Sequence, residues 1–272
     1  MSESWINGLA ADSVAIADRG LQYGDGLFET LTCIDGRVRW LALHLERLSR
    51  GCERLGLPSP DLPALATEIA ARAPPQGRCI LKLILTRGIA RQRGYRPGGE
   101  QGPTCILTRY DWPASSARSD SGFRVAISSV TLGVNPLLAG IKHLNRLEQV
   151  LAQAAIGASP LEEVLMLSSE GQVIGGSMSN VFLAGESGLF TPELTRCGVE
   201  GIMRRLVCSA AAQLGLPLAV RAVRVAELAG VREAFLTNVR WGIQPISVLE
   251  GRALSERRHA DRLRGWVDAA RG

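Results

Sequence analysis

The chain has 272 residues, of which 31 are basic and 26 acidic, so its formal net charge is +5 at pH 7. These charges are spread along the sequence, which argues against a basic tail of the kind that binds nucleic acid. Residues 1–8 show no basic stretch followed by an apolar one, and no apolar run is long enough to span a bilayer. We therefore expect a globular, cytoplasmic protein with a sizeable core, in one large domain or two modest ones.

Cysteine usage agrees with a reducing compartment. The six cysteines form no C-x-x-C pair, and most of them sit in apolar runs: Cys33, Cys52, Cys79, Cys105, Cys197 and Cys208. Scattered cysteines in such surroundings are typically buried free thiols.

Strands and helices alternate in the first half of the chain. Apolar patterning predicts strands at 14–16, 27–34, 38–41, 79–86 and 104–110. The dipeptide Asp35-Gly36 between two of them is a strong hairpin signal. A helix with one apolar face is predicted over 44–57, and a second helix begins at Asp61 and ends before Pro74.

A polar stretch, DWPASSARSDSG at 111–122, has the composition of a linker. We therefore expect an N-terminal α/β domain at 1–113, a linker at 114–122 and a C-terminal domain at 123–272. Strands in the second domain are predicted at 123–130, 164–167, 181–183 and 234–238. Helices are predicted after Gly201 and over 258–270.

The stretch GIKHLNRLEQ at 140–149 places one lysine between a glycine-containing turn and a predicted helix. Asn145 followed by Glu148 is typical of an N-cap with its reciprocal partner. Apolar residues then recur at helical spacing, which predicts a buried face: Leu147, Val150, Leu151 and Ala154. Lys142 would lie near the core with limited water, where a neutral amine can attack a carbonyl and form a Schiff base. The spacing by itself fits an ordinary solvated lysine as well.

Several segments, in the right order, resemble the fold-type IV pyridoxal-phosphate-dependent enzymes. The stretch 140–149 is similar to their Schiff-base lysine segment, and the glycine-rich stretch 18–26 is similar to their R-G-x-x-Y-G-D-G segment. The remaining similarities are the H-x-x-R spacing of His44 and Arg47, R-G-Y at 93–95, GGSMSNVF at 175–182, GIMR at 201–204 and AFLTN at 234–238. Within the family, GIKHLNRLEQ together with R-G-Y most resembles the aminodeoxychorismate lyases.

The resemblance implies a two-domain mixed α/β fold of the D-amino-acid aminotransferase type, usually a homodimer. It also implies pyridoxal 5'-phosphate as cofactor and a small-molecule substrate, with no metal, nucleic acid or membrane as partner. The implied reaction is a lyase step in folate biosynthesis. Two alternatives stay open: a branched-chain or D-amino-acid aminotransferase of the same fold, and a non-catalytic protein that binds the cofactor.

The resemblance further implies roles for individual residues. Lys142 would hold the cofactor and act in catalysis, together with Thr30, whose counterpart lies beside the lysine in the lyases. The cofactor phosphate would be bound by Arg47, Gly201, Ile202, Met203, Thr237 and Asn238, through a guanidinium fork, a helix N-terminus and polar side chains. Substrate binding would involve Arg93, Tyr95 and Tyr110, the first two at carboxylate groups.

Each of these residues also has a plainer interpretation. Thr30 has the β-branched side chain common in strands, and an isolated arginine such as Arg47 is usually solvated. The loop 87–102 is rich in glycine and arginine, as solvated loops are, and a glycine before a helix, such as Gly201, is common.

The sequence departs from the family at Gly175, where the family carries a glutamate that bonds the pyridine nitrogen of the cofactor. A carboxylate there keeps the nitrogen protonated and makes the ring a stronger electron sink. We expect either that water or a neighbouring group such as Glu170 substitutes, or that the ring works largely unprotonated. Our hypothesis is that a lyase tolerates the change because its product becomes aromatic, which supplies much of the driving force.

Overall fold

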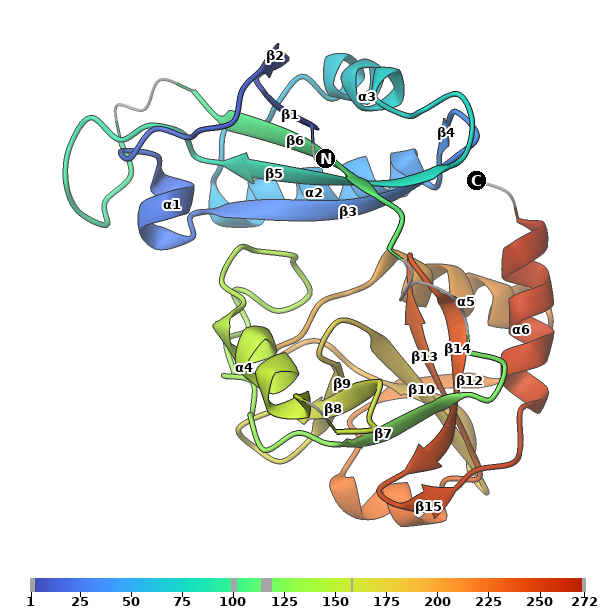
Figure 1. Ribbon diagram of the computed structural model, residues 1–272. Helices are drawn as coiled ribbons and strands as arrows, with labels where there is room; N and C mark the ends of the chain where they lie inside the picture. The colour runs from blue at the N-terminus through green and yellow to red at the C-terminus, as the bar shows by residue number, and fades with distance from the viewer. Residues whose placement is uncertain (1–2, 99–101, 114–118, 158, 271–272) are drawn as a thin grey trace. The chain divides into compact units, whose positions relative to one another are not determined.

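The computed structural model describes residues 3–98, 102–113, 119–157 and 159–270 (Figure 1). These residues form two compact units: one comprises 3–98, 102–113 and 141–145, and the other comprises 119–140, 146–157 and 159–270. The segment around Lys142 therefore groups with the first unit, although it lies after the predicted linker. Residues 114–118 of that linker lie outside the described residues, and the domain limits stay a prediction.

The first unit is built on an antiparallel sheet with the strand order β2-β1-β6-β5-β3-β4. Its elements are β1 (Glu3–Ile6), β2 (Leu9–Ala10), α1 (Arg19–Tyr23), β3 (Gly26–Ile34), β4 (Arg37–Val38), α2 (Leu41–Leu55), α3 (Leu62–Ala71), β5 (Arg78–Thr86) and β6 (Thr104–Asp111). The hairpin at Asp35-Gly36 is confirmed, since β3 pairs with β4 across it.

Alternation along the strands gives this sheet two different faces. One face is largely apolar and packs against α2, where Gly51 lies so close to Leu27 that a Cβ at position 51 would come within 2.7 Å of the leucine. The other face carries Phe28 and Thr30, which are only partly buried. The stretch 142–144 lies beside β3 at its N-terminal half, because the Phe28 amide donates to the Lys142 carbonyl at 2.9 Å and the Leu144 amide to the Gly26 carbonyl at 3.0 Å.

The second unit contains a mixed sheet in the order β12-β11-β10-β13-β14-β7-β8-β9, with β15 paired to β14. Its elements are β7 (Phe123–Ile127), α4 (Leu147–Ile156), β8 (Glu163–Leu167), β9 (Val173–Gly176), β10 (Asn180–Gly185), β11 (Gly188–Pro192), α5 (Ile202–Gln213), β12 (Leu218–Arg221), the 3-10 helix η2 (Val225–Gly230), β13 (Glu233–Asn238), β14 (Gly242–Leu249), β15 (Arg252–Ala253) and α6 (Arg258–Ala269). The pairs β11–β12, β14–β7 and β7–β8 are parallel.

The core of the second unit lies on both faces of its sheet. One cluster contains Leu165, Leu183 and Leu236. On the other face the rings of Phe182 and Phe235 stack with their centroids 5.0 Å apart, and α5 and α6 pack against β13 and β14 (Figure 1). The predicted mixed α/β class is therefore confirmed. The prediction of free thiols is also confirmed, since all six cysteines are free. No helix in the described ranges is long and apolar enough to cross a membrane.

Two expectations about secondary structure were wrong. Residues 14–16 form no strand, because no neighbouring strand offers them hydrogen bonds, and Ile16 is 84% exposed. The predicted buried face of α4 is instead exposed at Leu147, Val150 and Leu151, by 77%, 59% and 57%, while Ala152 on another side of the helix is buried.

The predicted cap of α4 was also wrong. The helix begins after Arg146, and the Asn145 side chain donates to the Gly24 carbonyl at 3.1 Å instead of capping the helix. The Glu148 carboxylate accepts from the Gly133 amide at 2.8 Å. Both side chains thus hold neighbouring loops in place, and long-range partners replaced the local ones that the spacing predicted.

Candidate active site

Lys142 lies on the partly buried face of the first unit's sheet. Its Nζ is 4.1 Å from the centroid of the Phe28 ring, and its side chain is half-buried. An ammonium group over an aromatic face is attracted by the ring quadrupole, while the ring excludes water from that side. This position agrees with limited access of water to Lys142, whose role stays a prediction.

Thr30 shares this face, two residues beyond Phe28 on the same strand. Directly opposite it on β5 is Lys82, whose Nζ is 5.7 Å from the same Phe28 ring. Side chains directly opposite in an antiparallel pair lie on one face, so Thr30 and both lysines belong to one surface. Tyr110, on β6 and 43% exposed, also points to this face, because it pairs in register with Ile80.

Arg47 lies on the other face of β3, opposite the one that carries Phe28 and Thr30. Its guanidinium donates to the Glu29 carboxylate from Nε at 2.7 Å and from Nη2 at 2.5 Å, and His44 Nδ1 is 2.6 Å from the same carboxylate. All three side chains are buried, so the solvated interpretation of Arg47 was wrong. Burial raises the pKa of Glu29, but the charge and hydrogen bonds of Arg47 and His44 outweigh it and lower that pKa to about 2.

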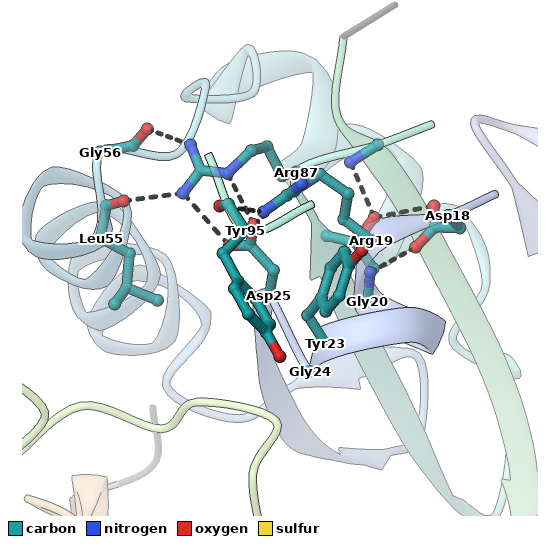
Figure 2. A network of polar contacts seen from close by, with 12 residues as sticks. Asp18, Arg19, Gly20, Tyr23, Gly24, Asp25, Leu55, Gly56, Arg87 and Tyr95 are labelled. Carbon is teal, nitrogen blue, oxygen red and sulfur yellow. Dashed lines mark hydrogen bonds and ion pairs between the residues drawn. The ribbon is translucent and has the colours of Figure 1, made fainter. Parts of the chain in front are cut away.

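A second buried ion cluster shapes the glycine-rich stretch 18–26 (Figure 2). The Asp25 carboxylate accepts from Arg19 Nε at 2.8 Å and from Arg87 Nε and Nη2 at 2.8 and 3.1 Å. Burial raises the pKa of Asp25, but the hydrogen bonds and charges of Arg87 and Arg19 together hold it below its ordinary value. Arg87 also donates to the Gly56 and Leu55 carbonyls at the end of α2.

Arg19 connects this cluster to the R-G-Y loop. Its Nη1 and Nη2 donate to the Gly94 and Tyr95 carbonyls at 3.1 and 3.0 Å, and the Tyr95 ring meets the Tyr23 ring edge-on at 5.5 Å (Figure 2). The Tyr95 side chain is 86% exposed, and Arg93 is exposed as well. The structure therefore anchors the loop by its backbone. Sequence reasoning missed Arg19 as an anchor, although the R-G-x-x-Y-G-D-G segment contains both it and Asp25.

The start of α5, in the second unit, is one of the places predicted to bind the cofactor phosphate. No side chain in the described part of the chain caps this helix, whose first residues Ile202 and Met203 have buried side chains. The Gly201 amide donates to Asn180 Oδ1 at 3.1 Å, and a Cβ at position 201 would come within 2.2 Å of that oxygen, so any side chain there would displace Asn180. Sequence reasoning did not single out Asn180, although it stands within the GGSMSNVF segment.

Thr237 supplies a polar atom at the same place. It lies on β13 directly opposite Asn180, and its buried hydroxyl has no hydrogen-bond partner within the described structure. A buried hydroxyl without a partner is costly, which favours a ligand that accepts from it. The Asn238 side chain turns elsewhere, since its Oδ1 accepts from the Arg240 and Trp241 amides at 3.0 and 2.9 Å.

Comparison with known proteins places the chain in a family. The profile of the family described as Amino-transferase class IV matches residues 26–249. The chain belongs to this family. It is 32% identical over 244 residues to an aminodeoxychorismate lyase from Vibrio harveyi, covering 89% of this chain and 90% of that protein.

Solved structures agree with this membership. The structure of 4-amino-4-deoxychorismate lyase from Pseudomonas aeruginosa matches with a TM-score of 0.89 and 42% identity, over 97% of this chain and 99% of that one. A branched-chain aminotransferase from Thermoproteus uzoniensis matches with a TM-score of 0.84 and 25% identity, over 96% and 93% of the two chains. The predicted fold-type IV architecture is thereby confirmed.

Within this family the structure accounts for Gly175. A Cβ there would lie 2.8 Å from the Ser179 carbonyl oxygen, so any side chain requires the backbone to shift. Glu170, considered as a substitute for the missing glutamate, is 45% exposed and pairs with Arg196. Glu170 is therefore engaged with Arg196 at the surface, and what replaces the family's glutamate stays a prediction.

The buried carboxylate beside this segment is Glu163. It accepts from the Ser177 amide and hydroxyl, from the Ser179 hydroxyl at 3.0 Å and from the Met178 amide at 3.3 Å. Burial raises the pKa of Glu163, and these hydrogen bonds only partly oppose the effect. Because donors surround its oxygens, Glu163 holds the 175–179 turn in shape.

Proposed function

We propose that this chain is a pyridoxal-phosphate-dependent lyase that converts 4-amino-4-deoxychorismate to 4-aminobenzoate and pyruvate, in the cytoplasm, for folate synthesis. The observation that carries the proposal is the position of Lys142, held against Phe28 on the face that also presents Thr30. The lyase named among the similar solved structures, at 42% identity over almost the whole chain, supports this reaction over the aminotransferase alternative.

The residues present fit the phosphate of the cofactor. The unpartnered hydroxyl of Thr237 and the uncapped start of α5 at Gly201, Ile202 and Met203 provide donors for phosphate oxygens. Arg47 is held by Glu29 on the face of β3 opposite Lys142, so its role at the phosphate stays a prediction, whereas Asn238 would order the turn after Thr237. When bound, pyridoxal phosphate would supply an electron sink for the bond changes at the substrate ring.

The chain's own groups then move protons. In our proposal, Lys142 Nζ removes the proton from the ring carbon that carries the substrate's amino group. The carbon–oxygen bond to the enolpyruvyl group breaks, the ring becomes aromatic, and a proton from Lys142 or from the Thr30 hydroxyl goes to the departing pyruvate. In this proposal one amine does both the acid and the base work, and the Phe28 ring limits the water around it.

We also propose that the protein is a homodimer. The apolar stripe on α4 formed by Leu147, Val150 and Leu151 is more than half exposed at each position, which supports an interface between subunits. Light scattering should give twice the chain mass of 29.1 kDa. A monomer at micromolar concentration would contradict this part of the proposal.

The test begins with the visible spectrum of the protein with added pyridoxal phosphate, before and after borohydride. Peptide mapping should then find the reduced cofactor on Lys142, and the assignment is simple because Lys82 is the other lysine of the chain. Lys142→Ala should lose the covalent attachment and release no pyruvate from aminodeoxychorismate. Attachment elsewhere would refute the mechanism, and half-transamination with alanine or a branched-chain amino acid, without pyruvate release, would favour the aminotransferase.

A further inference from the structure

Both lysines of the chain contact one aromatic ring. These lysines are Lys82 and Lys142, and the other 29 of the 31 basic side chains are arginines. The distances from Lys142 Nζ and Lys82 Nζ to the Phe28 centroid, 4.1 and 5.7 Å, place the two amines within about 10 Å of each other. The function proposed above uses Lys142 and leaves Lys82 without a role.

The register of the sheet shows where Lys82 points. It stands on β5 directly opposite Thr30 on β3 and Thr108 on β6. Side chains in such a row share a face, so Lys82 lies between two hydroxyl-bearing side chains on the same surface as Phe28 and Lys142. The side chain of Lys82 is half-buried and accordingly has only part of its hydration.

No carboxylate from these strands neutralises the positive charge of Lys82. Within the described residues it forms no ion pair, and the acidic residues of β1 and β6, Glu3 and Asp111, occupy register positions of the opposite face. The Glu29 carboxylate also leaves β3 on that opposite face. A partly desolvated ammonium group beside hydroxyls, with no anion from its own sheet, is a favourable place for the carboxylate of a ligand.

We propose that Lys82 binds a carboxylate of the substrate and selects for an amine whose carboxylates are remote from its nitrogen. This inference rests on the proposed function. An ordinary amino acid carries its carboxylate on the carbon that bears the amine. Aminodeoxychorismate instead carries one carboxylate across the ring from its amine and a second on the enolpyruvyl group. Lys142 engages the amine end, and Lys82, within reach on the same face, provides the charge for a remote carboxylate.

The test compares Lys82→Met, which removes the charge, with Lys82→Arg, which keeps it. Arg78→Met is the matched control, because Arg78 is an exposed cation on the same strand and face, where it lies against Trp112. The probes are aminodeoxychorismate, followed by pyruvate release, and chorismate, which has both carboxylates but no amine. Chorismate binding is measured by calorimetry on the cofactor-loaded protein.

Lys82→Met should raise KM and the chorismate Kd by about 10- to 100-fold, as expected for a lost hydrogen bond between charged groups, with kcat within about 3-fold. Lys82→Arg should recover most of the affinity, and Arg78→Met should change neither value more than about twofold. All variants should keep borohydride-fixable cofactor on Lys142, which shows that the site is folded.

The outcomes separate this inference from the proposed function. If the wild type binds chorismate through Lys82 but releases no pyruvate, the role of Lys82 stands and the lyase function is wrong. If the wild type is a lyase and Lys82→Met leaves KM and chorismate binding unchanged, the inference is overturned. It is also overturned if Arg78→Met weakens binding as much, or if both Lys82 variants lose cofactor attachment, because Lys82 would then act through general charge or structure.

Discussion

The buried cluster of Glu29, His44 and Arg47 should make the first unit sensitive to acid. The pKa of Glu29 falls from 4.5 to about 2 on folding, and both side chains that surround the carboxylate are themselves buried. A shift of this size corresponds to about 3 kcal/mol of stability at neutral pH. Because the folded pKa is the lower one, this contribution is complete well above pH 4.5 and is lost as the pH falls towards 2.

Glu29→Gln isolates this contribution. The amide keeps one acceptor for Arg47 but removes the charge, so we expect the variant to unfold with about 3 kcal/mol less free energy than the wild type at pH 7. At pH 3 about 2 kcal/mol of this difference should have disappeared, because the wild-type carboxyl is then increasingly protonated in the unfolded chain.

Urea unfolding of the cofactor-free protein at pH 7, 5 and 3 measures the difference, and hydrogen exchange of β3 peptides assigns it to the first unit. Glu53→Gln, at an exposed position on the same helix α2, should change stability by less than about 0.5 kcal/mol. A gap between Glu29→Gln and wild type that is as large at pH 3 as at pH 7 would refute the reasoning, since the stabilisation could not then come from an ionised carboxylate.

Three further predictions concern other buried polar groups. Arg19→Met removes the hydrogen bonds to the Gly94 and Tyr95 carbonyls, so trypsin should cleave the R-G-Y loop at least about 10-fold faster than in the wild type. An unchanged cleavage rate would contradict the anchoring role of Arg19. Glu163→Gln places an amide among donors, which should cost about 2 kcal/mol in urea unfolding; equal stability would show that these bonds are dispensable. Thr237→Val should leave the stability of the cofactor-free protein within about 0.5 kcal/mol, because the lost hydroxyl has no partner, but should weaken pyridoxal phosphate binding about 10-fold in a spectral titration. Unchanged binding would remove this hydroxyl from the phosphate site.

Local patterns in the sequence were sufficient for most elements. Apolar alternation and turn chemistry predicted β3, β5 and β6 and the hairpin at Asp35-Gly36, because a strand pair and its tight turn depend on neighbouring residues. The segment 140–149 and the glycine-rich stretch 18–26 indicated the family, because their residue types are tied to a chemistry rather than to packing. Short strands such as β9 and β12 were not predicted, since a few residues carry too little periodicity.

Side-chain partners depended on tertiary contacts. Asn145 and Glu148 had the spacing of a helix cap, yet each bonds a loop distant in sequence. The apolar residues of α4 recur at helical spacing, and this spacing is the same in a buried helix and in an exposed one. Periodicity therefore could not show that Leu147 is exposed.

For the candidate site, too, the sequence indicated some residues and the tertiary structure others. The sequence by itself indicated Lys142 as the amine to test and showed that position 175 lacks a carboxylate. Only the tertiary structure decided that Glu163, and not Glu170, is the buried carboxylate of that region. It also showed that Lys82 and Lys142 lie near the same Phe28 ring. Burial and cross-strand register arise from residues far apart in the chain, and no local pattern encodes which of two similar side chains ends beside the chemistry.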